Sequence, residues 1–189
     1  INKAWGYGVK NPDHYFLALN YRMNELTGAV GAAQLAKLDD FVARRTRMAA
    51  MLTEGLQGLP GVSPPAVDPG FTHTYWKYCL HVDGSRLEGG LDALAGRLRD
   101  RGVFCAPRYI QKPAFECQVL RDQRTFGDSR FPFTLARPEA VDYSRERFPG
   151  TYAALASVLV LPLNERYTDE HVRQVVEVIR TAVTDIAKD

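Results

Sequence analysis

Apolar residues recur at helical spacing from residue 24 to residue 58, and this long pattern constrains the fold more than any other feature of the sequence. Asn24 is a favourable N-cap, and Glu25 suits the positive end of a helix dipole. The pattern ends at the segment 58–61, Gly-Leu-Pro-Gly, which is a typical helix stop. Its apolar residues are Leu26, Ala29, Val30, Ala33, Leu38, Phe41, Val42, Met48, Met51 and Leu52.

A single helix over this stretch would be ~52 Å long at 1.5 Å per residue. A compact body of 189 residues has a diameter of only roughly 42 Å. We therefore expect the helix either to bend, at Gly28 and Gly31, or to reach another domain or subunit, and we favour the second. Small residues from Gly28 to Ala33 would let another backbone approach closely. Packing on the chain's own core is the alternative, since small residues also occur there.

The rest of the sequence alternates between strand and helix patterns. The predicted elements are a strand at 72–82, a helix at 88–101, a strand at 103–110, a short helix at 148–156, a strand at 158–161 and a last helix capped by Thr168. Residues 111–147 show little periodicity, and such a segment is usually functional or packs against another surface. This order predicts an α+β fold (α/β in some schemes), with helices packed on one side of a small sheet and a long leading helix.

Composition excludes several classes of protein. The net charge of +2 is too small to indicate a nucleic-acid or membrane partner, and no apolar run approaches the ~18–20 residues that span a membrane. Three widely spaced cysteines, Cys79, Cys105 and Cys117, indicate a reducing compartment, and we expect the cytoplasm. Because the chain starts at Ile1 without a signal-peptide pattern, we expect it to start inside a longer or processed protein.

Motifs for phosphate loops, dinucleotide binding, serine hydrolysis and zinc proteolysis are missing from the sequence. The histidines show no metal-ligand spacing, and His73 and His81, which flank a β-rich run, are expected to be structural. The best candidate binding element precedes the long helix and consists of Tyr15, Asn20, Tyr21 and Arg22. Arginine binds phosphate or carboxylate, and asparagine can both donate and accept. Loop anchoring and capping is the alternative role for this cluster.

Residues 19–45 carry a family resemblance. The pattern is Asn-x-Arg-Met-x-Glu from Asn20 to Glu25, followed by a small-residue helix, Gln-Leu, Leu-Asp and a double Arg at 44–45. It resembles the DegT/DnrJ/EryC1/StrS aminotransferases, which are pyridoxal-phosphate (PLP) enzymes of fold type I that aminate keto sugars or cyclitols. Ala18 stands where many members have Gly. The stretches His73–Tyr78, 102–110 and 161–168 are similar to the family's small domain.

The resemblance implies that residues 1–23 end the large PLP-binding domain and form an interface loop, and that residues 24–189 form the C-terminal small domain. It also implies a Schiff-base lysine upstream of Asn20, so we expect no catalytic residue here and an isolated chain that is inactive and does not retain PLP. The lysines present are Lys3, Lys10, Lys37, Lys77, Lys112 and Lys188, and none has the family's Ser-x-x-x-Lys context.

For individual residues, the resemblance implies that Asn20 reaches the PLP phosphate of the other subunit of a homodimer and that Arg22 supports this loop or binds an anion. Arg108 and Tyr109 are expected on the substrate side. The parent enzyme would transfer an amino group from glutamate or glutamine to a keto sugar, nucleotide-linked in our interpretation, or to a cyclitol. The alternative is a stand-alone binding or dimerisation module derived from such an enzyme.

Overall fold

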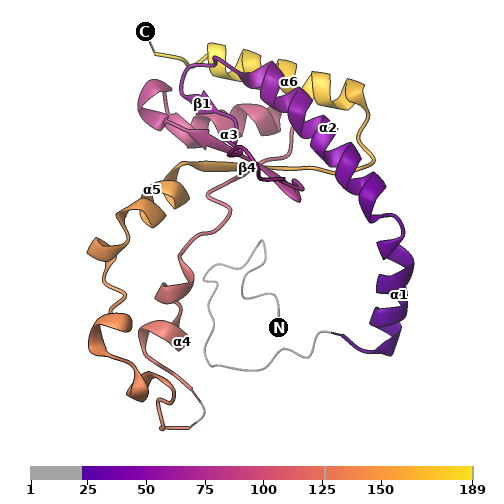
Figure 1. Cartoon of the computed structure of the whole chain (residues 1–189). Helices are drawn as coiled ribbons and strands as arrows, with labels where there is room; N and C mark the ends of the chain where they lie inside the picture. Colours follow the sequence, from indigo (N-terminus) through magenta and orange to yellow (C-terminus); the bar gives the residue numbers. More distant parts are fainter. Residues whose placement is uncertain (1–22, 126, 189) are drawn as a thin grey trace. The chain divides into compact units, whose positions relative to one another are not determined.

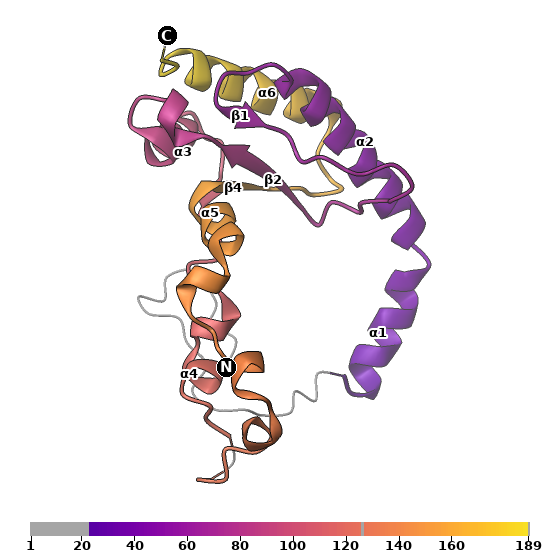
Figure 2. The same ribbon diagram turned by 60° about the vertical axis from the view of Figure 1, so that its left-hand side comes forward.

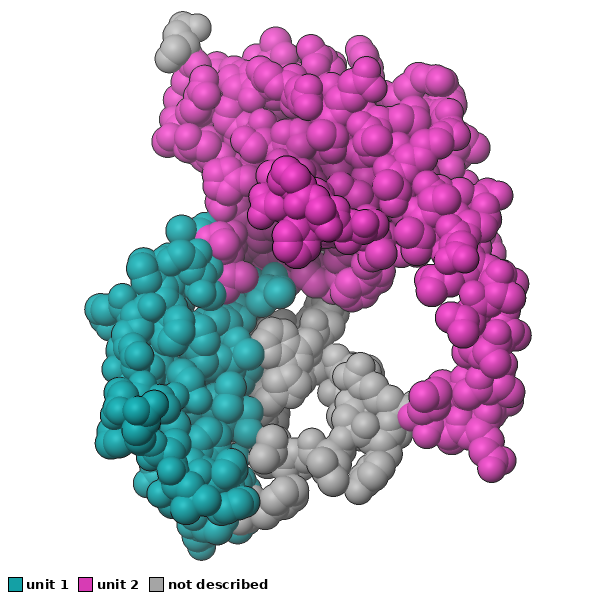
Figure 3. Space-filling model, viewed as in Figure 1, with its two compact units in different colours: residues 1–22, 110–153 teal, residues 23–109, 154–189 magenta. Residues whose placement is uncertain are grey.

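The computed structural model describes residues 23–125 and 127–188. In this part the chain divides into two compact units, one of residues 23–109 and 154–188 and one of residues 110–153 (Figure 3). None of the helices in the described residues is long and apolar enough to cross a membrane. The larger unit contains the sheet and the main core, and it is described first.

Four antiparallel strands form one sheet in the order β1-β2-β4-β3. Their bounds are β1 Val62–Ser63, β2 Lys77–Val82, β3 Ala106–Pro107 and β4 Val158–Pro162. The central pair, β2 and β4, sets Tyr78 opposite Leu161 and Leu80 opposite Leu159. Because side chains alternate along a strand, these four residues share one face of the sheet, and all four are buried.

Three helices cover this face: α2 (Leu38–Leu56), α3 (Gly90–Asp100) and α6 (Asp169–Thr184). α2 and α6 lie side by side above the sheet (Figure 1), and α3 also packs against α6. The helices contribute to the core Met48, Ala49, Leu52, Leu56, Leu91, Leu94, Ala95, Leu98, Val172, Ile179, Ala182 and Val183. This arrangement confirms the predicted α+β fold with helices on one side of a small sheet.

The leading helix is broken, so the expectation of one continuous helix is wrong. α1 (Glu25–Leu35) ends before Ala36, and α2 starts at Leu38. The Lys37 N–H donates to the Gln34 carbonyl at 3.0 Å, which closes a turn at this point. Asp39 and Asp40 then occupy the first turn of α2, where acidic side chains favour a new helix start. The break is therefore not at Gly28 or Gly31, both of which lie inside α1.

The predicted cap of α1 is confirmed, because the Thr27 N–H donates to Asn24 Oδ1 at 2.9 Å. α1 nevertheless has no buried residue along its length. Its apolar side chains Leu26, Val30 and Leu35 are all more than half exposed. Figure 2 shows α1 continuing away from α2 beyond the end of the sheet.

Two predicted strands are shorter than expected. In the strand predicted at 72–82, the Tyr75 N–H donates to His73 Nδ1 at 2.9 Å, and Tyr75 has a φ of 50°. The strand β2 therefore starts only at Lys77. In the second, Arg108 has a φ of 48°, and the strand is reduced to Ala106–Pro107. Left-handed residues cannot continue an extended strand. The short strand β1 was not predicted.

The helices at 88–101, 148–156 and after Thr168 are confirmed as α3, α5 (Pro149–Ser157) and α6. Thr168 and His171 form a capping box in which the His171 N–H donates to Thr168 Oγ1 and the Thr168 N–H donates to His171 Nδ1. His171 is therefore part of the helix start.

The smaller unit, residues 110–153, consists of short turns of helix. They are η3 Ala114–Glu116, α4 Gln118–Arg121, η4 Phe133–Leu135, η5 Pro138–Ala140, η6 Arg145–Arg147 and the first half of α5. Phe115 gathers them by stacking on Tyr143 and Phe148 and meeting the edge of Tyr152. Stacked rings provide the packing of this unit in the absence of a regular sheet.

Candidate substrate-side site

A lysine lies between two aromatic rings at the start of β2. Lys77 Nζ is 4.1 Å from the centroid of the Trp76 ring and 3.3 Å from the centroid of the Tyr109 ring. The atom is buried and has no hydrogen-bond partner in the part of the chain that the structure describes. We call Trp76, Lys77 and Tyr109 the aromatic cage. Both ring contacts fall within the range of cation–π interactions.

The residue before Tyr109 is fixed from two sides. The Arg108 N–H donates to the Val158 carbonyl at 2.8 Å, which attaches the end of β3 to β4. The Arg108 guanidinium is paired with the Asp92 carboxylate on α3. This ion pair partly neutralises Arg108, so its charge is not fully available to an anionic ligand.

β2 supplies a second polar group on the same face as Lys77. Cys79 lies two residues along the strand and is exposed. Partial burial raises the pKa of the Cys79 thiol, and the positive charge of Lys77 opposes that rise. The thiol is therefore predominantly protonated at neutral pH, which does not favour a nucleophilic role.

The structure tests the placement of only some of the predicted site residues. Asn20 and Arg22 lie outside the described residues, so their roles stay predictions. Arg108 and Tyr109 are described, and the structure joins Arg108 to Asp92 and Tyr109 to Lys77. Sequence reasoning did not select Lys77, Trp76 or Asp92. One available signal was the lysine between Trp76 and Tyr78, because lysine is depleted in strands.

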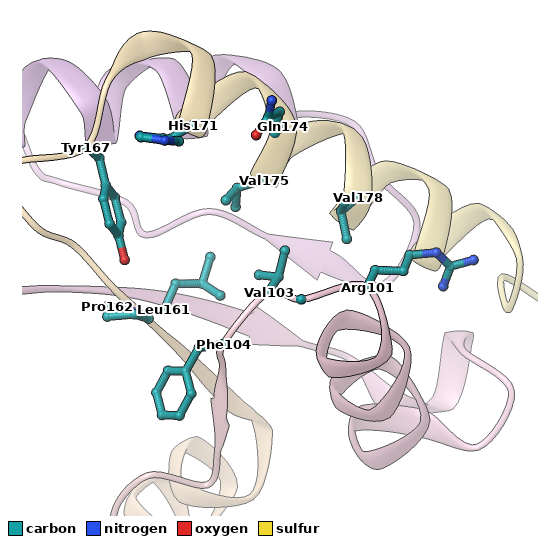
Figure 4. Close-up of a pocket in the computed structure, with 11 residues that line it drawn as sticks. Arg101, Val103, Phe104, Leu161, Pro162, Tyr167, His171, Gln174, Val175 and Val178 are labelled. Atoms are coloured by element: carbon teal, nitrogen blue, oxygen red, sulfur yellow. The ribbon is translucent and has the colours of Figure 1, made fainter.

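A groove of about 530 Å³ lies between α6 and the segment that leads into β3 (Figure 4). Its floor is apolar, with Val103, Leu161 and Val175 among its lining residues. Two polar side chains at its margin have partners, since Arg101 donates to Asp185 at 2.9 Å and His171 belongs to the capping box of α6. The groove is not lined by a lysine.

The surroundings of three of the described lysines are defined. Lys77 Nζ is enclosed by the aromatic cage, and Lys188 Nζ donates to the Ser85 carbonyl at 3.0 Å. Lys37 lies at the break between α1 and α2. No group of three histidine, cysteine or acidic side chains in residues 23–125 and 127–188 is placed to hold a metal ion.

The fold identifies the class of protein. The aminotransferase TlmJ from Streptoalloteichus hindustanus has a similar structure, with a TM-score of 0.60 and 26% sequence identity over 86% of this chain and 37% of that one. The architecture is that of the small domain of PLP-dependent aminotransferases.

The sequence comparison agrees. Residues 3–180 match the profile of the DegT/DnrJ/EryC1/StrS aminotransferase family, and the chain belongs to this family. It is 28% identical to the spore coat polysaccharide biosynthesis protein SpsC of Bacillus subtilis, over 96% of this chain and 41% of SpsC. It is 27% identical to dTDP-4-dehydro-2,3,6-trideoxy-D-glucose 4-aminotransferase of Saccharopolyspora spinosa, over 85% of this chain and 34% of that protein. The chain thus spans less than half the length of these relatives.

Proposed function

We propose that this chain is the C-terminal part of a PLP-dependent aminotransferase that transfers an amino group from glutamate or glutamine to a nucleotide-linked keto sugar. The observation that carries the proposal is the family match over residues 3–180. It is supported by the similarity to a relative whose name specifies a dTDP-linked 4-keto sugar. We place the enzyme in the cytoplasm, as a homodimer.

In this proposal the residues of this chain and those of the remainder of the enzyme have different roles. The lysine that forms the imine, and most of the donor site, belong to the remainder of the enzyme. Asn20 and Arg22 contribute contacts to the PLP phosphate across the dimer, and Arg108 and Tyr109 contribute to the acceptor side. In this proposal no chemical step is assigned to the described residues.

The test uses the full-length protein with PLP, L-glutamate or L-glutamine, and a panel of dTDP-, UDP- and GDP-linked keto sugars. Amino transfer from glutamate would release one 2-oxoglutarate for each amino sugar formed, and both products are measured by mass spectrometry. The 189-residue chain is the control, and it should show neither product nor a PLP imine band. Failure of the full-length protein to aminate any keto sugar or cyclitol would overturn the proposal.

A stand-alone binding or dimerisation module is the second candidate. It is favoured by α1, whose eleven residues include none that is buried and whose apolar side chains Leu26, Val30 and Leu35 are exposed. Absorbance separates the two candidates, because the purified natural protein with bound PLP is yellow and a module is colourless. Borohydride-trapped PLP on one of the chain's own lysines, together with turnover, would contradict the expected inactivity of the chain.

A further inference from the structure

We propose that Lys77 is a positioning residue that holds the ring of Tyr109 for the keto-sugar acceptor, an inference that rests on the proposed aminotransferase function. The contact joins the start of β2 to the residues that follow β3, two segments far apart in the sequence. Tyr109 would touch the acceptor, and Lys77 would act through Tyr109.

The charge of Lys77 contributes little to the stability of the fold. An ammonium group has three N–H donors, yet Nζ is buried without a hydrogen-bond partner in the described part of the chain. A buried charge without acceptors is unfavourable, and an apolar side chain of similar length avoids that cost. The faces of Trp76 and Tyr109 compensate only in part. What the ammonium does provide is a fixed location for the Tyr109 ring.

The backbone on both sides of the cage is also held in an unusual conformation. Tyr75 and Arg108, with φ values of 50° and 48°, are left-handed residues other than glycine, and each lies within two residues of a cage member. Such conformations persist where the surroundings impose them, and they cluster at ligand sites. The hydrogen bond from the Arg108 N–H to the Val158 carbonyl holds the backbone before Tyr109, and Lys77 contacts the Tyr109 ring.

A fixed tyrosine suits a sugar ligand. Its ring can pack against the apolar face of a sugar ring, and its hydroxyl can both donate and accept a hydrogen bond. Immobilising the ring before binding lowers the entropy lost when the acceptor binds. The contribution of Lys77 should therefore appear in the binding of the acceptor and not in the binding of the amino donor.

The test compares Lys77→Met, Lys77→Arg and the matched control Lys188→Met in the full-length enzyme. Lys77→Met should raise KM for the keto sugar roughly 2- to 30-fold, the range that cation–π contacts support. KM for the donor and kcat should change by less than about twofold, and Tm should be unchanged or higher because a buried charge has been removed. Lys77→Arg should retain most of the acceptor affinity, since a guanidinium also stacks on aromatic rings. Lys188→Met should leave both KM values unchanged.

An unchanged KM for the acceptor in Lys77→Met would overturn the inference. A lower Tm together with equal increases in KM for donor and acceptor would also overturn it, because Lys77 would then have only a structural role. If the wild type itself aminates no sugar, the proposed function fails and the contact is tested by NMR in the 189-residue chain. The methylene protons next to Lys77 Nζ should then be shifted upfield by the rings, and Tyr109→Leu should remove part of the shift. Resonances at random-coil positions would overturn the inference independently of activity.

Discussion

The hydroxyl groups of Thr53 and Tyr78 lie 2.8 Å apart and join α2 to β2 through a partly buried hydrogen bond. Tyr78 is fully buried, and burial raises the pKa of its phenol to about 12, although the hydrogen bond with Thr53 acts in the opposite direction. The folded protein therefore favours the neutral phenol more strongly than the unfolded chain does.

Tyr78 should consequently limit stability at high pH. Its unfolded form ionises near pH 10, so its contribution is complete below that pH and is lost as the pH rises toward the folded pKa of about 12. We expect a loss of about 1.4 kcal/mol by pH 11 from this residue. Urea unfolding of the wild type and Tyr78→Phe between pH 9 and 11 measures it. Equal decline in both proteins would show that the phenol does not ionise differently on unfolding.

Gly55 lies in α2 where this helix packs against Val176 of α6. A Cβ built at this position would lie 2.6 Å from Val176 Cγ1, and a β-branched side chain in a helix has little freedom to move away. Overpacking of about 1–3 kcal/mol should exceed the helix-propensity gain of about 1 kcal/mol. We therefore expect Gly55→Ala to lower the free energy of unfolding, and Val176→Ala to rescue it in the double variant.

Gly96 is the matched control for this substitution, because it lies inside α3 and a Cβ there would meet nothing within 4 Å. Gly96→Ala should stabilise the chain by up to about 1 kcal/mol. Thermal and urea unfolding of the wild type and the three variants decide the outcome. A Gly55→Ala protein as stable as Gly96→Ala would mean that the two helices separate easily.

The ion pair between Arg45 and Glu165 should contribute to acid stability. Arg45 Nη2 lies 2.7 Å from Glu165 Oε2, and this hydrogen bond lowers the pKa of the Glu165 carboxyl. The stabilisation is present above the unfolded pKa of about 4.5 and is lost as the pH falls through the lower folded pKa. Because the pair is partly solvated, its loss in Glu165→Gln should cost at most about 1 kcal/mol at pH 7 and nothing at pH 2.

Glu170→Gln is the control for the acid series. It removes an ion pair with Arg173 that is more exposed than the pair between Arg45 and Glu165. At pH 7 it should change the unfolding free energy by less than Glu165→Gln does. A pH-independent difference between Glu165→Gln and the wild type would show that the carboxylate charge is not what stabilises the contact.

The exposed face of α1 should make the isolated chain self-associate. Leu26 and Val30 lie four residues apart in α1, and both are more than half exposed, as is Met23 before the helix. An eleven-residue helix without buried contacts is marginal in water, so a partner should stabilise it. Sedimentation at micromolar concentration should show dimers or larger species, and Leu26→Lys should shift them toward monomer. Ala32→Lys, on the opposite side of α1, is the control; a monomeric wild type would contradict the prediction.

Asn20 should matter for cofactor retention in the full-length enzyme. A hydrogen bond to a charged group contributes about 1.5–3 kcal/mol, so Asn20→Ala should weaken PLP binding roughly 10- to 150-fold while Tm without PLP stays the same. Equilibrium dialysis with PLP gives the dissociation constant. The same affinity in both proteins would restrict Asn20 to anchoring its loop.

The elements that could be predicted from sequence are those whose signals are local. The stop after α3 and the Thr168 cap of α6 each depend on neighbouring residues, and both occur as expected. The prediction that the strand extends before Lys77 was wrong, because the Tyr75 N–H donates to the His73 side chain and not to a neighbouring strand. Apolar spacing continues through the break at Lys37, so periodicity alone could not locate it.

The candidate site was less predictable because its contacts join distant segments. Tyr109 was selected by family resemblance, but its contact with Lys77 depends on how β2 and β3 flank β4. In the sequence, Asp92 is an acidic residue of a predicted helix with nothing to mark a role. The packing of α3 brings it to Arg108. Hydrophobic patterning reports which residues face the core, and it does not report which polar residues meet outside it.

The two outer strands of the sheet, β1 and β3, have only two residues each. Strands this short expose few free N–H and C=O groups, so they offer a poor template on which another chain could extend the sheet. Growth of a fibril by addition of strands to the folded domain is therefore disfavoured, even though α1 exposes apolar side chains. Self-association of this chain should yield discrete helix-mediated oligomers that do not bind thioflavin T.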